Sequence, residues 1–181
     1  MFTLIRDDGY LLSTDPGRLD LDRVHHWLST DAYWALGLDR GTMERAFAGS
    51  VAFGVYRPGD GRQVAVARAV TDGATFAWLC DVYVDPGERG HGLGTWLAGA
   101  VRDHLAELGV RRILLATLDA HGVYAKVGFA PVGPDHYLQL DQRGGPVTPG
   151  GEVAVTAVGE TPVTRATRKE PGGPPPLTVE A

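Results

Sequence analysis

The strongest structural signal in this chain is the segment Val82-Tyr83-Val84-Asp85-Pro86-Gly87-Glu88-Arg89-Gly90-His91-Gly92-Leu93-Gly94-Thr95. It begins as an apolar strand, passes through a glycine-rich turn, and opens a helix whose apolar residues recur every three or four positions. Glycines let backbone N–H groups approach an anion closely, and a helix N-terminus adds positive potential there. The segment therefore predicts a loop that binds a pyrophosphate.

Two common phosphate-binding loops do not fit this segment. The dinucleotide fingerprint requires a third glycine at position 97, where the sequence has Leu97, and a βαβ unit around it. The nucleotide P-loop requires Gly-Lys-Ser/Thr, and the segment contains no lysine. A different kind of phosphate loop is expected.

The chain before the loop reads as short strands and helices. We expect a hairpin of Phe2–Arg6 and Tyr10–Ser13, and a helix that is capped by Asp20 and runs to Leu28. Two shorter helical pieces are expected near Asp31–Leu36 and near Thr42–Ala48. Three strands follow at Val51–Arg57, Gln63–Thr71 and Thr75–Val84. Because only short turns separate these strands, antiparallel pairing is expected.

The chain after the loop alternates helices and strands. The long helix keeps an apolar face from Leu93 to Leu108, and Gly109 ends it. A strand at Arg112–Thr117, a short helix at Asp119–Val127 and a strand at Tyr137–Leu140 are expected to follow. This order predicts an α+β (mixed α/β) domain, with helices packed on a largely antiparallel sheet.

Composition sets the domain boundary near residue 142. Residues 143–181 hold 7 of the 12 prolines and no aromatic residue. Such a stretch has too little apolar area to offset the entropy lost on ordering, so we expect residues 1–142 to form the domain and residues 143–181 a disordered tail. A tether, or a ligand for a proline-recognition domain, is the alternative interpretation of the tail.

Overall composition argues against several classes of protein. The 181 residues are 44% hydrophobic and 22% charged, with a net charge of −5, which disfavours a nucleic-acid partner. No apolar run reaches the roughly 18 residues of a membrane helix, and residues 1–8 do not resemble a signal peptide. The single cysteine, Cys80, suits a reducing compartment, so a cytoplasmic location is expected.

Two segments together resemble one known family. Arg89, Gly92 and Gly94 match the pattern Arg/Gln-x-x-Gly-x-Gly/Ala, the acetyl-CoA-binding motif of the GNAT superfamily of N-acetyltransferases. Residues 120–129, Ala-His-Gly-Val-Tyr-Ala-Lys-Val-Gly-Phe, resemble the family element Ala-x-x-x-Tyr-x-x-x-Gly-Phe at the spacing that the family uses. The resemblance covers about residues 1–141 and implies a GNAT-like fold, with acetyl-CoA as co-substrate.

The resemblance also implies which residues contact the cofactor. In the family, backbone amides of the motif hold the pyrophosphate, and the pantetheine arm pairs with the preceding strand like an extra strand. Carried over, the cofactor contacts are Val82, Tyr83, Val84, Arg89, Gly90, His91, Gly92, Leu93, Gly94 and Thr95. The competing interpretation is a glycine-rich turn without a ligand. The family often has asparagine where this chain has Thr117, which leaves the pantetheine contacts less defined.

Tyr124 matches the family tyrosine that protonates the departing thiolate. A phenol with a pKa near 10 can donate a proton as thiolate charge develops, since a free thiol has a pKa near 8.5. A tyrosine that merely packs in the groove is the alternative. We expect Asp119 to cap the helix that carries Tyr124, and His121 to be a structural residue or a proton shuttle.

Asp81 is the only charged residue in the apolar run from Phe76 to Val84. A carboxylate in a buried strand is costly unless it is paired, so it needs a partner such as a substrate ammonium, a water chain or an arginine. One hypothesis is that Asp81 binds the acceptor amine or helps to remove its proton. The other is that it is a structural carboxylate that accepts hydrogen bonds from backbone donors.

The aromatic residues Tyr33 and Trp34 are candidates for contacting the acceptor. Their rings could stack on an amine substrate or form cation–π contacts with it, although core packing would explain them as well. Cys80 alternates with Trp78 and Val82, which predicts a core thiol, and an acyl-cysteine intermediate is a weaker alternative. No cysteine and histidine spacing suggests a metal site.

The function expected from these features is N-acetyl transfer from acetyl-CoA to a primary amine, by direct attack in a ternary complex. Because the chain has no strong acidic or basic run, a small-molecule acceptor is expected rather than a protein tail. The alternatives are a non-catalytic acyl-CoA sensor of the same fold, or an acyltransferase that uses a longer acyl-CoA. Members of the family are often dimers, so the resemblance is compatible with a homodimer, and the sequence itself does not indicate the oligomeric state.

Overall fold

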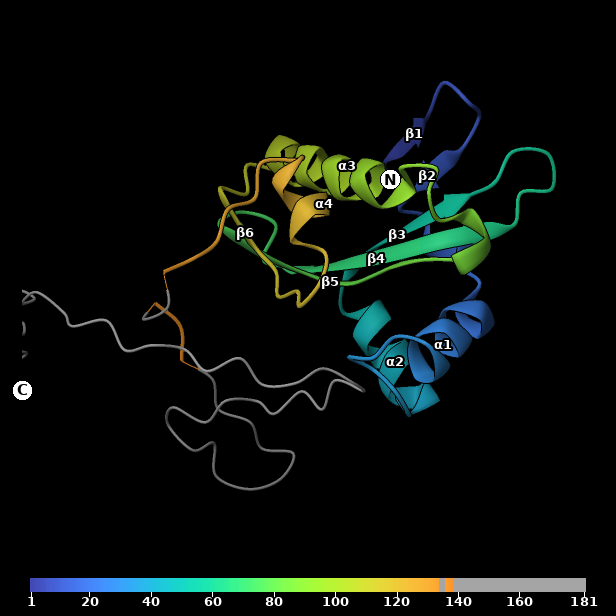
Figure 1. Ribbon diagram of the computed structural model, residues 1–181, viewed down its shortest axis with the longest axis horizontal. Coiled ribbons are helices and arrows are strands. Elements are labelled where there is room, and N and C mark those ends of the chain that lie inside the picture. The colour runs from blue at the N-terminus through green and yellow to red at the C-terminus, as the bar shows by residue number, and fades with distance from the viewer. Residues whose placement is uncertain (134–135, 139–181) are drawn as a thin grey trace, which may run out of the picture. The chain divides into compact units, whose positions relative to one another are not determined.

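In the part of the chain that the structure describes, six strands form one sheet, in the same order as they occur in the chain (Figure 1). The computed structural model describes residues 1–133 and 136–138, and one compact unit, Met1–Val132, contains all of these strands. The strands are β1 (Thr3–Ile5), β2 (Leu11–Ser13), β3 (Val51–Tyr56), β4 (Gln63–Thr71), β5 (Phe76–Val84) and β6 (Arg112–Leu114). Neighbours from β1 to β5 are antiparallel and β6 is parallel to β5, so the predicted largely antiparallel α+β fold is confirmed.

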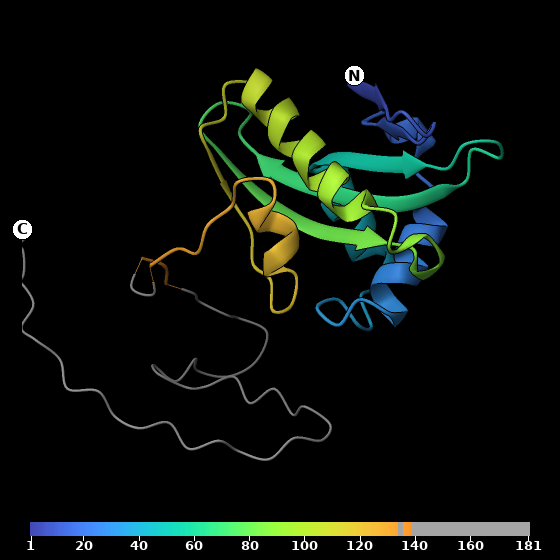
Figure 2. The same cartoon turned by 45° about the horizontal axis from the view of Figure 1, so that its top comes forward.

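Helices cover both faces of this sheet. Figures 1 and 2 show α1 (Leu21–Thr30) and α2 (Arg40–Ala48) on one face, and α3 (Leu93–Glu107) and α4 (His121–Ala125) on the other. The side chain of Asp20 caps α1 by accepting a hydrogen bond from the backbone N–H of Arg23 at 2.9 Å, as the sequence predicted. Asp39 caps α2 in the same way. Both helices thus begin where a short polar side chain satisfies a free backbone donor.

Each face of the sheet has its own hydrophobic core. On the α3 side, fully buried side chains of the sheet and of α3 pack together, including Phe53, Leu97 and Leu105. On the other side, Val24, Leu28 and Met43 of the two N-terminal helices pack on the sheet. Burying such side chains contributes roughly 1.5–3 kcal/mol each. The two cores fix the sheet between two layers of helix.

A bulge in β5 changes which side chains face each core. Val66 pairs with Tyr83 and Arg68 with Cys80, so β5 has one more residue than β4 in this interval. Asp81 lies there with a φ of 51°, in the left-handed region. Before the bulge Leu79 is buried on the α3 side, whereas after it Tyr83 is buried on the α1–α2 side. The alternation of β5 therefore reverses at Asp81.

Some predicted elements differ in the structure. The segment near Asp31–Leu36 forms turns instead of a helix, because the chain folds back and the N–H of Gly37 bonds to the carbonyl of Ser29. The strand at Arg112–Thr117 ends at Leu114, and the last helix starts at His121. Tyr137 and Leu138 are not in a strand; residues 139–140, the boundary near residue 142 and the tail at 143–181 lie outside the described residues.

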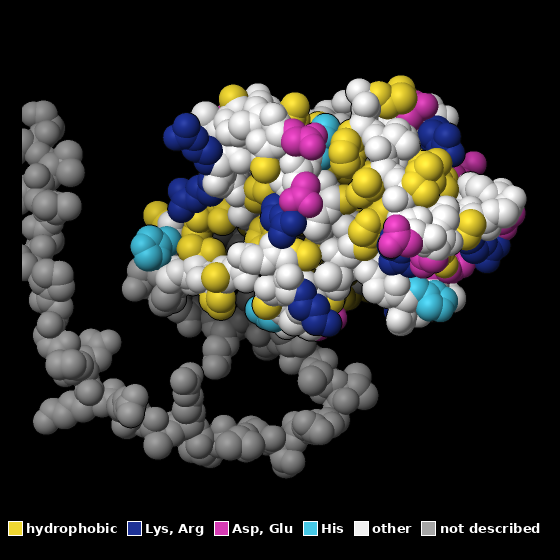
Figure 3. Space-filling view, turned by 90° about the horizontal axis from the view of Figure 1, so that it is seen from above, with side chains coloured by type: hydrophobic (Ala, Val, Ile, Leu, Met, Phe, Trp, Pro, Cys, Tyr) yellow, Lys and Arg dark blue, Asp and Glu magenta, His cyan; other side chains and the backbone are white. Residues whose placement is uncertain are grey.

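The surface of the α3 side is mixed in character. Figure 3 shows charged side chains of both signs spread over this face, with apolar atoms between them. Within the part of the chain that the structure describes, no helix combines the length and the apolar character needed to cross a membrane.

Candidate active site

A cavity opens where β5 and β6 separate. These parallel strands pair only through Phe76, Ala77 and Trp78, and then diverge. The resulting cavity has a volume of about 760 Å³. Its walls come from the turns after α1, the second half of β5, the glycine-rich loop, the chain after β6, and α4. Segments distant in sequence therefore meet around one space, which is how binding sites in folded domains commonly form.

The glycine-rich loop forms one end of the cavity. Gly90 and Gly92 adopt φ values of 87° and 72°, which residues with a Cβ rarely adopt. Gly92 is the N-cap of α3 and supplies no capping side chain, so the first N–H groups of the helix have no side-chain partner. This geometry favours an anion at the helix N-terminus.

Charged side chains around the loop hold its shape. Arg89 donates from Nε to the carbonyl of Val84 at 3.1 Å and from its guanidinium to Asp31 at 3.3 Å, and it lies over the ring of Tyr83. Tyr83 in turn donates its hydroxyl hydrogen bond to Asp31. The Arg89 side chain is thus tied to the protein, which leaves the backbone amides of the motif as the available donors.

A buried carboxylate joins the loop to the N-terminal hairpin. Glu88 accepts a hydrogen bond from the hydroxyl of Tyr10 at 2.6 Å and one from Arg57 at 3.1 Å. Arg6 also donates to the carbonyl of His91 at 3.0 Å. Sequence reasoning missed these contacts because 31 to 85 positions separate the partners. It also assigned His91 to the cofactor contacts, whereas this residue does not line the cavity.

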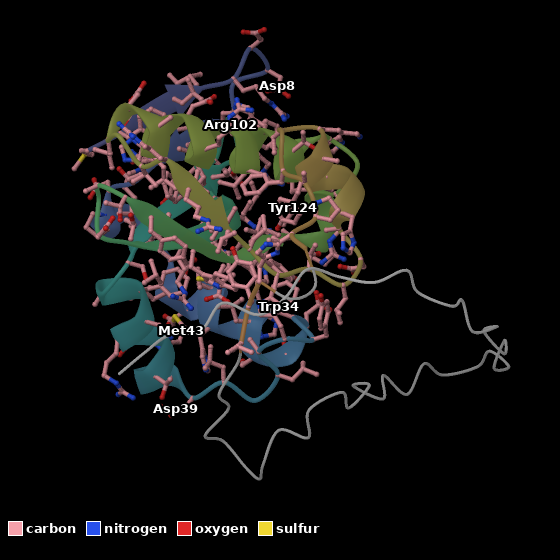
Figure 4. The ribbon with its side chains drawn as sticks, turned by 90° about the vertical axis from the view of Figure 1, so that its left-hand side faces the viewer. Asp8, Trp34, Asp39, Met43, Arg102 and Tyr124 are labelled. Atoms are coloured by element: carbon pink, nitrogen blue, oxygen red, sulfur yellow. The ribbon has the colours of Figure 1, made fainter. Side chains whose placement is uncertain are left out.

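Tyr124 lines the same cavity. It projects from α4, packs edge-to-face on Phe129 with 5.8 Å between ring centroids, and lines the cavity together with the loop. Figure 4 shows it across from Trp34, which comes from the turn after α1. Burial raises the pKa of Tyr124 to about 12. The phenol is therefore protonated at neutral pH, as a proton donor must be.

Asp81 is paired with an arginine from the neighbouring strand. One oxygen of Asp81 forms an ion pair with Arg68, and the other accepts a hydrogen bond from Nε1 of Trp34 at 3.2 Å. An arginine was one of the partners expected for this carboxylate, but sequence reasoning did not identify Arg68. A signal existed, because Arg68 and Asp81 are lone charges in adjacent apolar strands.

Tyr33 and Trp34 both line the cavity. Their rings meet edge-to-face with centroids 4.9 Å apart. The hydroxyl of Tyr33 accepts a hydrogen bond from the backbone N–H of Leu118 at 3.4 Å, which links the turns after α1 to the chain after β6. Trp27, which comes shortly before them in the chain, is buried in the core and does not line the cavity.

Two sequence interpretations are wrong. Asp119 does not cap α4, because the N-cap residue is Ala120, whose N–H donates to Oγ1 of Thr117 at 3.0 Å. Cys80 is a half-buried thiol that lines the cavity and is not a core thiol, since the bulge places it and Val82 on opposite faces. Burial raises the pKa of Cys80 to about 11, which keeps it a poor nucleophile.

Two other interpretations concern histidine and metal. His121 is exposed on α4 and does not line the cavity. Among residues 1–133 and 136–138, no cluster of three metal-ligating side chains occurs.

Comparison with known proteins identifies the family. The sequence profile of the acetyltransferase (GNAT) family matches residues 21–129. A curated Gibberella zeae protein assigned as an acetyltransferase is 34% identical over 135 residues, which cover 65% of this chain and 76% of that protein.

Solved structures agree with this match. A crystal structure of a GNAT-family protein from Xanthomonas campestris pv. campestris has 46% identity and a TM-score of 0.63, over 68% of this chain and 85% of that one. N-acetylglutamate synthase from Neisseria gonorrhoeae, solved with coenzyme A and N-acetyl-glutamate, shares the fold at 16% identity. Its TM-score is 0.60, over 73% of this chain and 31% of that one. The family profile and the curated relative together establish that this chain belongs to the GNAT family of acetyltransferases.

Proposed function

We propose that the protein is an N-acetyltransferase that moves the acetyl group of acetyl-CoA to a primary amine of a small molecule. The observation that carries this proposal is that the protonated phenol of Tyr124 and the glycine-rich loop line one cavity. A cofactor anchored at the loop would then extend toward a proton donor. The acid and the anion site of an acyl transfer would thus lie within reach of one ligand.

The backbone supplies the expected cofactor contacts. The N–H groups from Gly90 to Thr95 would hold the pyrophosphate at the start of α3. Beyond Trp78, β5 no longer pairs with β6, so its edge from Leu79 to Val84 is available to the pantetheine arm. An extended ligand can then bind as an added strand would.

The chemistry follows from direct attack. The free amine attacks the thioester carbonyl carbon, a C–N bond forms, the C–S bond breaks, and the acetamide and free coenzyme A leave. Backbone donors on β5 would polarise the carbonyl, and Tyr124 would give its proton to the departing thiolate. Before attack, the acceptor ammonium would lose one proton to Asp81 or to solvent. The nitrogen would lose a second proton as the amide forms, and this proton would restore the Tyr124 hydroxyl.

Thiol release from acetyl-CoA across a panel of amines tests the proposal. Amine-dependent release by the wild-type protein, with acetylated amine as the product, is the expected result. Binding of acetyl-CoA without release by any amine would instead identify a sensor. Faster release from longer acyl-CoA thioesters would identify a different acyl donor. Failure to bind acetyl-CoA at all would refute the proposed cofactor.

A further inference from the structure

Three aromatic rings line the cavity besides those of Tyr83 and Tyr124. Tyr33, Trp34 and Trp78 line it, and they remain 47%, 44% and 38% exposed. Large rings left open to solvent inside a concave site are available to contact a ligand. Trp34 is also oriented, since its Nε1 is hydrogen-bonded to Asp81 and its ring meets Tyr33 edge-to-face. A pre-oriented aromatic wall favours a flat apolar group or an ammonium.

The charges around the cavity are mostly acidic. Among the described residues that line it, the acidic ones are Asp31, Asp81, Glu88 and Asp119, and the basic one is Arg89. Three of these acids are paired with arginines, Asp31 with Arg89, Asp81 with Arg68 and Glu88 with Arg57. A carboxylate or phosphate on the acceptor would therefore meet carboxylates and no uncommitted cation among these described residues, whereas an ammonium needs no such cation.

Arg68 is a cation that could have bound an acidic acceptor if it were not paired with Asp81. It is partly buried behind Asp81, forms an ion pair with that carboxylate, and donates to Oγ of Ser50 at 3.3 Å. The Asp81 side chain is only 11% exposed, so the pair is shielded from water. Asp81 thus neutralises the guanidinium and still has an oxygen, bonded to Trp34, that can accept another hydrogen bond from an ammonium.

We propose that the acceptor is a primary amine attached to an aromatic or compact apolar body that carries no carboxylate or phosphate. Trp34 and Tyr33 hold that body, and Asp81 holds the ammonium end. The Arg68–Asp81 pair is the specificity determinant, because it prevents the guanidinium from binding an acidic acceptor. This inference rests on the proposed function and names its substrate class.

Three related probes test the class directly. Phenethylamine, phenylalaninamide and phenylalanine share the ring and the amine, and differ in having no substituent, a neutral amide or a carboxylate. We expect the KM of phenylalanine to exceed that of phenethylamine by about 100-fold, because its carboxylate would be desolvated in the cavity without an uncommitted cation to bind it. Phenylalaninamide should lie within about tenfold of phenethylamine. Equal KM values for the acid and the amine would overturn the proposal.

Variants of Trp34 test the aromatic wall. Trp34→Leu should raise the KM for phenethylamine about tenfold, since cation–π and stacking contacts are of that size. Trp34→Phe keeps a ring and should recover most of the affinity. Phe76→Leu is the matched control, because Phe76 is exposed on β5 but does not line the cavity. Equal KM values for Trp34→Leu and Phe76→Leu would rule out a contact between Trp34 and the acceptor.

Variants of the ion pair test the specificity determinant. Asp81→Asn releases Arg68, so the preference for phenethylamine over phenylalanine should fall at least about tenfold. The double variant Arg68→Gln/Asp81→Asn should lose this gain for phenylalanine. An unchanged preference in Asp81→Asn, with native circular dichroism, would refute the assigned role. If Asp81→Asn does not fold, the three-probe comparison on the wild-type protein still decides the substrate class.

The two proposals can fail separately. Turnover of acidic amines in preference to neutral ones would leave the acetyltransferase proposal intact and overturn the substrate class. If other amines of the panel release thiol and none of the three probes does, the substrate class fails alone. If no amine of the panel releases thiol, the acetyltransferase proposal fails. Quenching of tryptophan fluorescence by the three probes, measured with coenzyme A bound, would then still show whether the cavity selects the neutral aromatic amine.

Discussion

At the scale of single residues, Tyr124 carries the sharpest prediction. Tyr124→Phe removes the hydroxyl but keeps the ring that packs on Phe129, so kcat should fall roughly 10²–10⁴-fold, the usual contribution of a positioned acid. The KM for acetyl-CoA should stay close to the wild-type value. Steady-state kinetics with the best amine of the panel measures both. A change confined to KM would make Tyr124 a packing residue.

Gly92 gives a second test at this scale. Its φ of 72° lies in the left-handed region, so Gly92→Ala should cost about 1–2 kcal/mol of stability although nothing crowds the new methyl group. Gly122 on α4 is the matched control, because it too has open space around it but no positive φ. Gly122→Ala should be stabilising by about 0.5–1 kcal/mol. Urea denaturation of both variants measures the difference, and equal effects would contradict the argument from backbone conformation.

At the scale of elements, the N-terminal hairpin is predicted to hold the glycine-rich loop in its binding shape. Tyr10→Phe removes the hydrogen bond to buried Glu88, and leaving that carboxylate oxygen unpaired should cost about 1–3 kcal/mol. If the cost falls on the loop, the dissociation constant for acetyl-CoA should rise several-fold with little change in kcat. Isothermal titration and steady-state kinetics check this split. Unfolding at lower urea without a change in cofactor affinity would show that the hydrogen bond supports only the fold.

Local elements were predictable from the sequence where their signals are local. The glycine-rich loop, α3 and the three-stranded meander follow from residues that are close together in the chain. The bulge was not predictable, because the residue with positive φ is Asp81 and not a glycine. Assuming strict alternation through it placed Cys80 in the core. One extra residue thus decided which side chains of β5 reach the cavity.

The contacts that complete the site were harder to predict because they are long-range. Trp34 reaches Asp81 and Tyr10 reaches Glu88 across 47 and 78 positions in the chain. No local pattern encodes such pairs, although the lone charges of Arg68 and Asp81 in neighbouring strands offered a clue. Most of the predicted residues line the cavity, with His91 as the exception, but their partners were not predicted.

At the scale of the whole molecule, His104 predicts a dependence of stability on pH. It stacks on Phe2 and meets Phe53 edge-to-face, and burial lowers its pKa below 6.5. Because the unfolded chain binds the proton more readily, this contribution is complete above pH 6.5 and is lost as the pH falls through the folded-state pKa. His104→Leu should flatten the stability curve between pH 7 and 5. Urea denaturation over this range measures it, with His121→Gln as the exposed control.

Carboxylates add a second, acidic part to the dependence of the free energy of unfolding on pH. Hydrogen bonds to Arg57 lower the pKa of Asp60 to about 2, and hydrogen bonds to Thr42 lower that of Asp39. A lowered carboxyl pKa stabilises the folded state above the ordinary value near 4, and this stabilisation is lost as the pH falls below it. This acidic part should therefore persist in His104→Leu. Its disappearance in that variant would place the whole pH dependence on the histidine.

The early separation of β5 from β6 has a consequence beyond the reaction. An unpaired strand edge inside a domain is a weak point of the fold, because it can pair with other chains and can unfold locally. A cofactor that binds along this edge binds only the folded state. At a concentration 100 times its dissociation constant, it adds about 2.7 kcal/mol to the free energy of unfolding. Resistance to proteolysis should then rise with acetyl-CoA. On the proposed function, the lifetime of this protein in a cell would thus follow the supply of acetyl-CoA.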